Sequence, residues 1–347
     1  MEKKMRIMTE SLLNAETPVE YLRSWITANS LFFDRNRGEI MKEPIPLSDW
    51  ELIIEGEVKE PQRFNFDRIT HMPKAIVANT LECSRNGRSF FKEKVMGNPW
   101  TTGGVGNAVW GGVWLKDLLE KARLKESAKH VAFEGFDRPR GSAGIKFIRS
   151  IPVEKALSST ILAYEMNGEP LSLKHGYPLR ELALGWTGAN CVKWLHKIIV
   201  MDRPFKGFFM DKVYRVFQKG ENSESGIVVT RLNVKSIITQ PMRDERLPVR
   251  PVTILGAAYA GEADVERVEV SVDSGKTWEP PTFIGPHEPF AWRQWQYIWE
   301  AKRTGEYTIL SRAADSGGRQ QPMNAHWNVL GYGNNGVPEH AVTITVT

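Results

Sequence analysis

The sequence has little cysteine and lacks the histidine patterns that hold common metals. Its 347 residues include two cysteines, which form no disulfide framework, no zinc pattern and no Cys-x-x-Cys-His haem attachment. The seven histidines form no His-x-His or His-Glu-x-x-His pair, which argues against a zinc hydrolase. A Gly-x-Ser-x-Gly elbow is missing as well. The run TTGGVGNAVWGG lacks the third glycine that a dinucleotide loop requires.

Long apolar runs and dense basic blocks are also absent. No apolar stretch is long enough to span a membrane. The net charge of +5 and the pI near 9.0 come from Lys and Arg spread along the chain, which argues against a nucleic-acid partner and favours an anionic substrate. Residues 1–22 have neither the apolar core of a signal peptide nor a twin-arginine pair. We therefore expect a cytoplasmic protein, or a periplasmic one if the N-terminus has been trimmed.

The chain is too long for one ordinary core, so two domains are expected. In the first, Thr17 caps and Pro18 begins one expected helix, and Ser150 caps and Pro152 begins another. Residues 113–124 predict a third helix with one buried face, because its apolar residues recur at helical spacing. These apolar residues are Leu115, Leu118, Leu119 and Ala122.

Strands are expected over residues 50–58 and 130–136, which are rich in apolar and β-branched residues. Because helices and strands interleave without a regular βαβ alternation, the fold class is α+β. From about residue 237 the pattern changes to short strands separated by turns, as in Val268, Val270 and Val272 before the Asp-Ser-Gly turn. This pattern predicts a β-sandwich of immunoglobulin type. We place the boundary after residue 238.

One cysteine lies in a cationic loop. In NTLECSRNGRSFF, residues 79–91, Cys83 is flanked by Arg85 and Arg88. The thiol is either a buried structural residue or a thiolate held by positive charge, as a nucleophile or as a ligand for a soft metal. The local sequence leaves these alternatives open. Further polar residues are scattered over the first 240 positions, and each alone is most simply a surface cation or a satisfied histidine.

Together these motifs resemble the sulfite oxidase family of molybdenum enzymes. ECSRNGR resembles the cysteine loop of that family, and FEGFD, AYEMNGEPL, HGYPLR and GANCVKWL follow in its order and at its spacing. FAWRQWQ and HWNVLGYGNNGV resemble its signatures in the second domain. The similarity covers residues 17–347. It implies a mixed α+β molybdopterin-binding domain, residues 1–238, followed by an immunoglobulin-like dimerisation domain, residues 239–347.

The resemblance also implies a cofactor and a site. The cofactor is molybdenum bound to molybdopterin, without haem, and Cys83 matches the thiolate ligand of the metal. The residues implied to bind the cofactor are Arg35, Asn36, Arg37, Asp137, His175, Arg180, Cys191, Val192 and Lys193. The residues implied to act on the substrate anion are Arg35, Arg88, Trp100, Tyr214 and Arg293.

The expected reaction is oxidation of sulfite to sulfate by oxo transfer, with two electrons passed to a separate acceptor such as a cytochrome c, or to oxygen. The alternatives are another substrate, such as nitrate, an organic S-oxide or sulfane sulfur, and a non-enzymatic binding protein with a structural cysteine loop. A homodimer is expected.

Some residues bear especially on the substrate. The family commonly has His where this chain has Arg37, and Gly then Arg where this chain has Arg85 and Gly87. Both departures add or relocate positive charge. Within the family, an arginine at the position of Arg293 marks sulfite-directed members. For that residue a cation–π contact with a neighbouring tryptophan is the competing interpretation.

Overall fold

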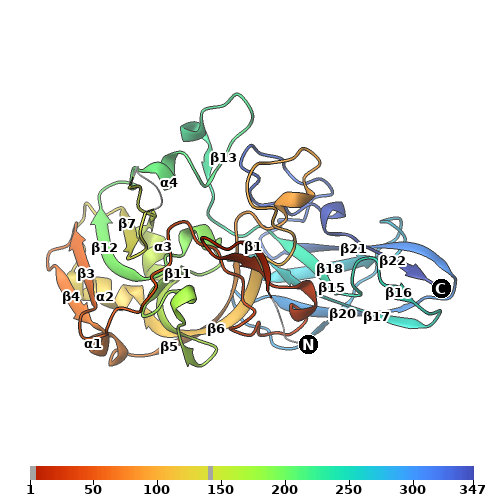
Figure 1. The fold of residues 1–347 in the computed structure, drawn as a ribbon, viewed down its shortest axis with the longest axis horizontal. Coiled ribbons are helices and arrows are strands. Elements are labelled where there is room, and N and C mark those ends of the chain that lie inside the picture. Colours follow the sequence, from red (N-terminus) through yellow and green to blue (C-terminus); the bar gives the residue numbers. More distant parts are fainter. Residues whose placement is uncertain (1–4, 140–143) are drawn as a thin grey trace.

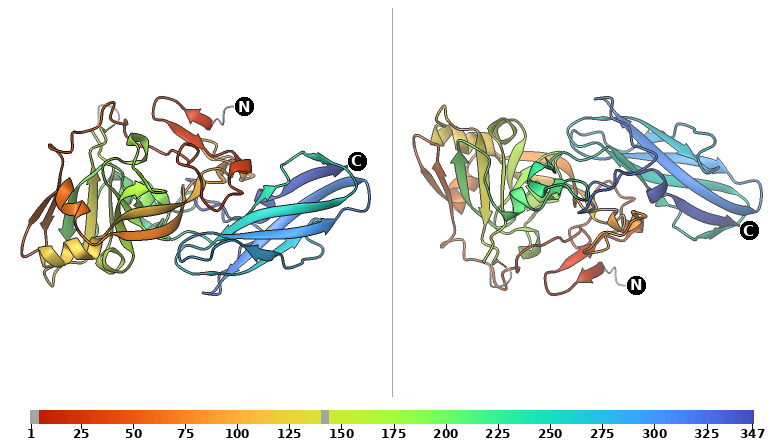
Figure 2. Two further views of the ribbon diagram at one scale, coloured as in Figure 1. Left: turned by 90° about the horizontal axis from the view of Figure 1, so that it is seen from below. Right: turned by 90° about the horizontal axis from the view of Figure 1, so that it is seen from above.

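The computed structural model describes residues 5–139 and 144–347. The molecule has two lobes, which lie next to each other along its longest axis, and the C-terminus lies at the far end of the second lobe (Figure 1). Both views in Figure 2 show this second lobe as an elongated pair of sheets. Within the described residues, no helix has the length and apolar character needed to cross a membrane.

The first lobe contains two five-stranded sheets. One is antiparallel throughout and consists of β10 (Glu169–Pro170), β9 (Thr160–Met166), β6 (Val105–Trp114) and β5 (Ala75–Glu82), with β11 (Arg180–Ala183) also paired to β9. The other has the order β4 (Gln62–Asn65), β3 (Glu51–Gly56), β12 (Leu195–Met201), β7 (His130–Gly135) and β8 (Ile148–Pro152). In this second sheet only β3 and β12 run parallel. The strands expected over residues 50–58 and 130–136 are β3 and β7.

The helices of the first lobe are short. They are α1 (Phe66–Thr70), α2 (Leu115–Ala122), α3 (Val153–Ser158) and α4 (Phe208–Asp211). The structure bears out the buried face expected for α2, because all four of its apolar positions have no exposed surface and pack into the core between the sheets. The fold contains both helices and strands, as the α+β interpretation predicts, but most of its ordered elements are strands.

The helix expected to open at Thr17 does not form. Only a single 3₁₀ turn, Val19–Tyr21, follows it. The Thr17 hydroxyl donates to the carbonyl of Leu31 at 2.7 Å instead of capping a helix. This long-range hydrogen bond satisfies the side chain that the local pattern assigned to a cap.

The cap expected at Ser150 is also wrong. Ser150 lies within β8, and its Oγ accepts a hydrogen bond from the backbone N–H of Phe205 at 3.1 Å. The helix itself exists as α3, but it begins at Val153, and Pro152 is the residue before its first turn. The strand continues through Ser150 because β8 pairs with β7 up to Pro152.

The second lobe has two four-stranded sheets that share one core. The first sheet is β15 (Lys235–Gln240), β17 (Pro251–Tyr259), β20 (Arg293–Glu300) and β19 (Thr282–Ile284). The second is β16 (Arg246–Leu247), β22 (Val342–Val346), β21 (Gly305–Asp315) and β18 (Val265–Ser271). Trp295 at the centre of this core is fully buried, and its indole N–H donates to Ser236 at 3.0 Å. The immunoglobulin-type arrangement and the boundary after residue 238 remain predictions; β15, which pairs with β17, spans that boundary.

Two small strand pairs lie outside the four sheets. They are the hairpin of β1 (Arg6–Thr9) with β2 (Asn14–Glu16) and the pair β13 (Arg215–Val216) and β14 (Ile227–Val228). The loop that follows β5 and the segment before β22 lie side by side between the lobes (Figure 1). Backbone hydrogen bonds join them, as from Gly333 N–H to the carbonyl of Ser84 at 2.8 Å. The second domain therefore contacts the Cys83 loop directly.

Candidate functional site

A cavity in the first domain, with about 720 Å³ of empty space that is partly open to solvent, collects most of the predicted site residues. The predicted residues that line it are Arg35, Asn36, Arg37, Cys83, Asp137, His175, Arg180, Cys191, Lys193 and Tyr214. They come from six separate parts of the first 240 residues. The fold therefore brings together a set whose members the sequence alone does not show to be neighbours.

Cys83 enters the cavity from the end of β5. Its backbone N–H donates to the carbonyl of Gly104 at 2.8 Å, and its carbonyl accepts from the N–H of Asn86 at 2.8 Å. Gly87, with a φ of +81°, lets the loop turn through the left-handed region. These bonds fix the backbone on both sides of the thiol.

The second cysteine of the cavity wall, Cys191, is chemically different. Burial raises the pKa of the Cys191 thiol to about 12, so this thiol stays protonated at neutral pH. A metal is bound by the thiolate. Of the two cysteines, Cys83 is therefore the better candidate for a metal ligand.

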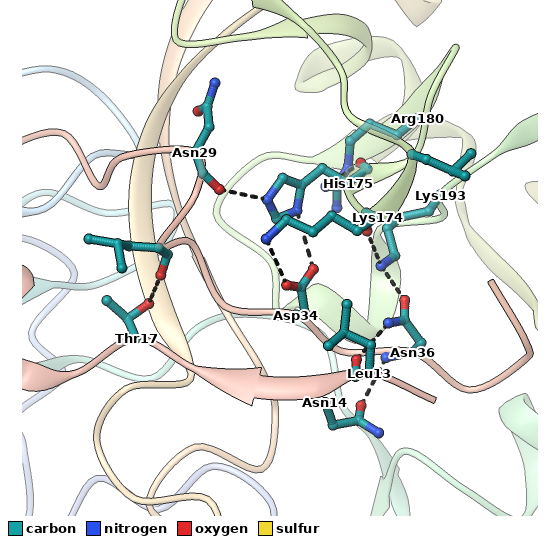
Figure 3. Close-up of polar contacts among 12 residues, drawn as sticks. Leu13, Asn14, Thr17, Asn29, Asp34, Asn36, Lys174, His175, Arg180 and Lys193 are labelled. Atoms are coloured by element: carbon teal, nitrogen blue, oxygen red, sulfur yellow. Dashed lines mark hydrogen bonds and ion pairs between the residues drawn. The ribbon is translucent and has the colours of Figure 1, made fainter. Parts of the chain in front are cut away.

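One side of the cavity is a dense polar network (Figure 3). The ammonium group of Lys193 donates to the side-chain oxygen of Asn36 and, at 2.7 Å, to the carbonyl of Lys174. Lys174 also donates to Asp34 at 3.1 Å. The ring of His175 lies between Asp34, 3.5 Å from Nδ1, and the carbonyl of Asn29, 3.0 Å from Nε2.

Burial governs protonation in this network. It lowers the pKa of Lys193 to about 7 and holds that of His175 well below its ordinary value. It also raises the pKa of Asp34, although Lys193 and Lys174 oppose the shift, and that of Asp137 to about 6. The loss of hydration therefore disfavours the ionised forms of these groups, so a bound anion would favour the charged form of Lys193.

Buried donors without partners show that this wall is suited to a polar group. Arg180 donates to the carbonyl of His175 at 2.9 Å and lies over the ring of Trp110, but its Nε–H has no partner among the described residues. The same is true of Nη2 of Arg37. Because buried donors are nearly always satisfied, these atoms indicate a missing acceptor. A phosphate-bearing pterin with a metal beside Cys83 fits this donor set.

A second cluster consists of arginines and tyrosines. Two of its members, Arg37 and Tyr214, line the cavity. Arg37 donates through Nε to the hydroxyl of Tyr214 at 2.9 Å. Tyr214 stacks on Tyr332, with ring centroids 5.5 Å apart, and Tyr332 accepts from Arg85 at 3.0 Å. Burial alone would raise the pKa of Tyr214, but the charges of Arg37, Arg35 and Arg85 outweigh it and lower the pKa to about 8.

Four predicted site residues do not line the cavity: Arg88, Trp100, Val192 and Arg293. Arg88 is buried, yet its guanidinium is bound to the backbone carbonyls of Met96 and Leu330. Trp100 is fully buried and packs edge-on against Phe33. Val192 contributes its backbone N–H to Glu181 at 3.0 Å rather than to the cavity.

The structure does not bring Arg293 to the cavity in the first domain. The residue begins β20, and its guanidinium lies 4.2 Å from the centre of the Phe283 ring on the neighbouring strand β19. The guanidinium of Arg293 thus makes a cation–π contact. This agrees with the competing interpretation, except that the aromatic partner is Phe283 and not Trp292 or Trp295.

Some residues of the site could not be read from the sequence. Tyr332 comes from the second domain, within the HWNVLGYGNNGV motif, whose resemblance was the available signal. Arg149 is fully buried, donates to Asn190 at 2.8 Å and lies 5.2 Å from the ring centre of Tyr214. Glu181, also fully buried, holds the backbone of Val192, and burial raises its pKa to about 8. Neither Arg149 nor Glu181 lies in a motif.

Comparisons with known proteins agree with this geometry. Residues 40–209 match the model of the oxidoreductase molybdopterin binding domain, and residues 227–347 match that of the Mo-co oxidoreductase dimerisation domain. Sulfite oxidase of Arabidopsis thaliana is 32% identical, over 94% of this chain and 91% of that protein. Nitrate reductase [NADH] 2 of Phaseolus vulgaris is 33% identical, over 95% of this chain and 41% of the reductase, so the chain spans about two fifths of such relatives.

A solved structure is similar over nearly the whole chain. The sulfane dehydrogenase SoxCD from Paracoccus pantotrophus superimposes with a TM-score of 0.86 and 26% sequence identity. The match covers 99% of this chain and 90% of the SoxCD chain. The similarity therefore extends over both lobes.

We expect Glu181 to make stability depend on pH. Its pKa rises from 4.5 to about 8 on folding, so within this window the folded chain keeps a proton that the unfolded chain releases. The free energy of unfolding then falls as the pH rises through the window. Glu181→Gln removes the titration and leaves an acceptor for the N–H of Val192. In thermal melts between about pH 5 and pH 8, the Tm of the wild type should fall relative to that of the variant. A constant difference in Tm would contradict a buried, protonated Glu181.

Proposed function

The chain belongs to the sulfite oxidase family of molybdopterin oxidoreductases, and on that premise we propose that it oxidises sulfite to sulfate at the Cys83 cavity. The observation that carries the proposal is the convergence of three guanidinium groups, one buried and two partly buried, on a cavity that also contains a cysteine thiol. Guanidinium groups bind oxyanions through paired, charge-assisted hydrogen bonds. The electrons would pass to a separate acceptor, such as a cytochrome c, or to oxygen.

Different residues of the cavity would bind different parts of the cofactor. Cys83 would hold the metal, Arg180 and Lys193 the phosphate of the cofactor, and Asn36 and His175 its polar ring edge. When bound, the cofactor supplies a molybdenum centre that transfers an oxygen atom and accepts two electrons. In this proposal no haem takes part.

The arginine–tyrosine cluster would bind the substrate. Arg35 and Arg37 place two positive charges beside Tyr214, whose hydroxyl is mostly protonated at pH 7 because its pKa is about 8. The hydroxyl can therefore donate to an oxyanion while it accepts from Arg37. Such preorganised donors stabilise charge without reorganisation during the reaction.

The relatives do not distinguish sulfite from nitrate as the substrate, because the nitrate reductases and the sulfite oxidases have similar sequence identity to this chain. The position of Arg293 no longer supports sulfite, because its side chain is bound to Phe283. What favours sulfite is charge: a dianion gains more from two guanidinium groups than the singly charged nitrate ion does. A steady-state screen of sulfite, nitrate and a sulfane-sulfur compound with several electron acceptors tests the proposal. Turnover of nitrate alone would overturn it.

Cys83→Ser should abolish turnover with the fold intact, because serine is close in size but lacks the soft thiolate that the metal needs. Cys191→Ser is the matched control, and we expect it to be far milder because the protonated Cys191 thiol binds no metal. Activity and circular dichroism of both variants check this. Full activity of the Cys83 variant would refute the assignment of the ligand.

Arg37→His and Arg85→Gly restore the residues common in the family. We expect at least one of them to raise KM for sulfite about tenfold, since a hydrogen bond to a charged group contributes roughly 1.5–3 kcal/mol. Initial rates at low ionic strength measure this, with Lys92→Ala, in the exposed part of the same loop, as the control. Unchanged KM in both variants would show that the two charges are structural.

We propose a homodimer formed mainly by the second domain, as the match to a dimerisation domain suggests. Light scattering should give about twice the 39.4 kDa of one chain. Ile298→Lys, at an exposed apolar residue of β20, should weaken the dimer, whereas Ile76→Lys, at an exposed residue of β5 in the first domain, should not. A monomer at micromolar concentration would contradict the proposal.

A further inference from the structure

A buried ion pair joins the two domains directly behind the Cys83 loop. Lys235 on β15 donates to Oε1 of Glu82, the last residue of β5, at 2.7 Å, and their side chains are 1% and 5% exposed. Tyr259 on β17 donates its hydroxyl to the same oxygen at 2.7 Å. One carboxylate of the first lobe is therefore held by two residues of the second lobe, to whose sheet β15 belongs although Lys235 precedes the predicted boundary after residue 238.

The same carboxylate also binds the loop that follows it. Asn86 donates to Oε1 of Glu82 at 3.0 Å, and its side-chain oxygen accepts from the N–H of Gly104 at 2.9 Å. The N–H of Asn86 donates to the carbonyl of Cys83, and the N–H of Cys83 to the carbonyl of Gly104. Glu82 and Asn86 thus close a ring of hydrogen bonds around Cys83.

The position of Glu82 depends on its cationic partner. A carboxylate buried without a compensating charge is strongly unfavourable, and removal of one member of a buried pair leaves the other uncompensated. Without Lys235, Glu82 would turn toward solvent or rearrange, and its bond to Asn86 would be lost with it. Since Glu82 adjoins Cys83 in the chain, this movement would displace the thiol.

We propose that Lys235 is a positioning residue, which fixes the Cys83 loop through Glu82 and so makes docking of the second domain a condition for metal binding. The inference rests on the proposed role of Cys83 as metal ligand. It gives the second domain a function in the catalytic site besides association between chains.

The chain offers a matched control. Lys155 of the first domain donates to Glu262, in the connection between β17 and β18, also at 2.7 Å, and its side chain is 4% exposed. This pair also joins the two lobes, although Glu262 is 30% exposed and also pairs with Arg231. No hydrogen bond links the pair to the Cys83 loop in the described part of the chain. Lys155→Met therefore reports the cost of weaker docking without the proposed effect on Cys83.

The experiment compares full-length Lys235→Met and Lys155→Met with the wild type. Each is produced with and without molybdate, and three properties are measured: molybdenum per chain, Tm, and the rate at which iodoacetamide alkylates Cys83 in the metal-free protein, read by peptide mass spectrometry. We expect both variants to lower Tm. Only Lys235→Met should lower the molybdenum content and raise the alkylation rate, by about tenfold or more, because local opening follows lost stabilisation exponentially.

The double variant Lys235→Met, Glu82→Gln covers the case in which the single variant does not fold. It leaves no unpaired buried charge, and the side-chain oxygen of the introduced glutamine can still accept from Asn86. Both its Tm and the alkylation rate of Cys83 should therefore return toward those of the wild type, and rapid alkylation of Cys83 in this variant would contradict the role of Glu82. Equal alkylation rates in the Lys235 and Lys155 variants would overturn the inference. Because alkylation needs neither metal nor substrate, this result is distinguishable from failure of the proposed function, which would appear as wild-type protein without molybdenum or without sulfite turnover.

Discussion

The site depends on negative partners that neutralise its positive charges, because burial removes much of their contact with water. Arg35, Arg37, Arg180 and Lys193 surround a single cavity, while the carboxylates nearby, Asp34 and Asp137, are themselves disfavoured as ions by burial. Buried charges are stable only when they are paired. The protein alone does not complete that pairing, since buried donors such as Nη2 of Arg37 lack partners among the described residues. An anionic cofactor and an anionic substrate would complete it.

The second lobe contributes to this site as well as carrying its own core. Tyr332 stacks on Tyr214, the carbonyl of Leu330 accepts from Arg88, and Lys235 neutralises Glu82. These contacts come from β15 and from the segment before β22, which lies beside the cysteine loop (Figure 1). The loop is thus held from both domains, and its geometry depends on how the domains dock.

Many of the residues that line the cavity could be predicted from the sequence. Cys83, Arg180 and Lys193 lie in motifs whose order and spacing resemble one family, and the fold places all three in one cavity wall. The family and the two matched domains are confirmed by the comparisons. The buried face of α2 was also predictable, because helical periodicity reports burial directly.

What the sequence could not show are contacts between residues far apart in the chain. Thr17 is a residue type that often caps helices, but its hydroxyl donates to the carbonyl of Leu31. Arg293 lies in a motif that suggested anion binding, but its guanidinium makes a cation–π contact with Phe283. Arg149 lies in no motif, and the motif that contains Tyr332 does not show that its ring stacks on Tyr214. In each case a tertiary partner competes with the role that the local pattern suggests.

We propose that the cationic cavity at Cys83 is a molybdopterin site. The elemental and pterin content of the purified protein tests this assignment most directly. We expect one molybdenum per chain, together with one molybdopterin released on denaturation. Protein that contains neither, after production with molybdate in a host that makes the cofactor, would contradict it and would favour a binding protein with a structural cysteine loop.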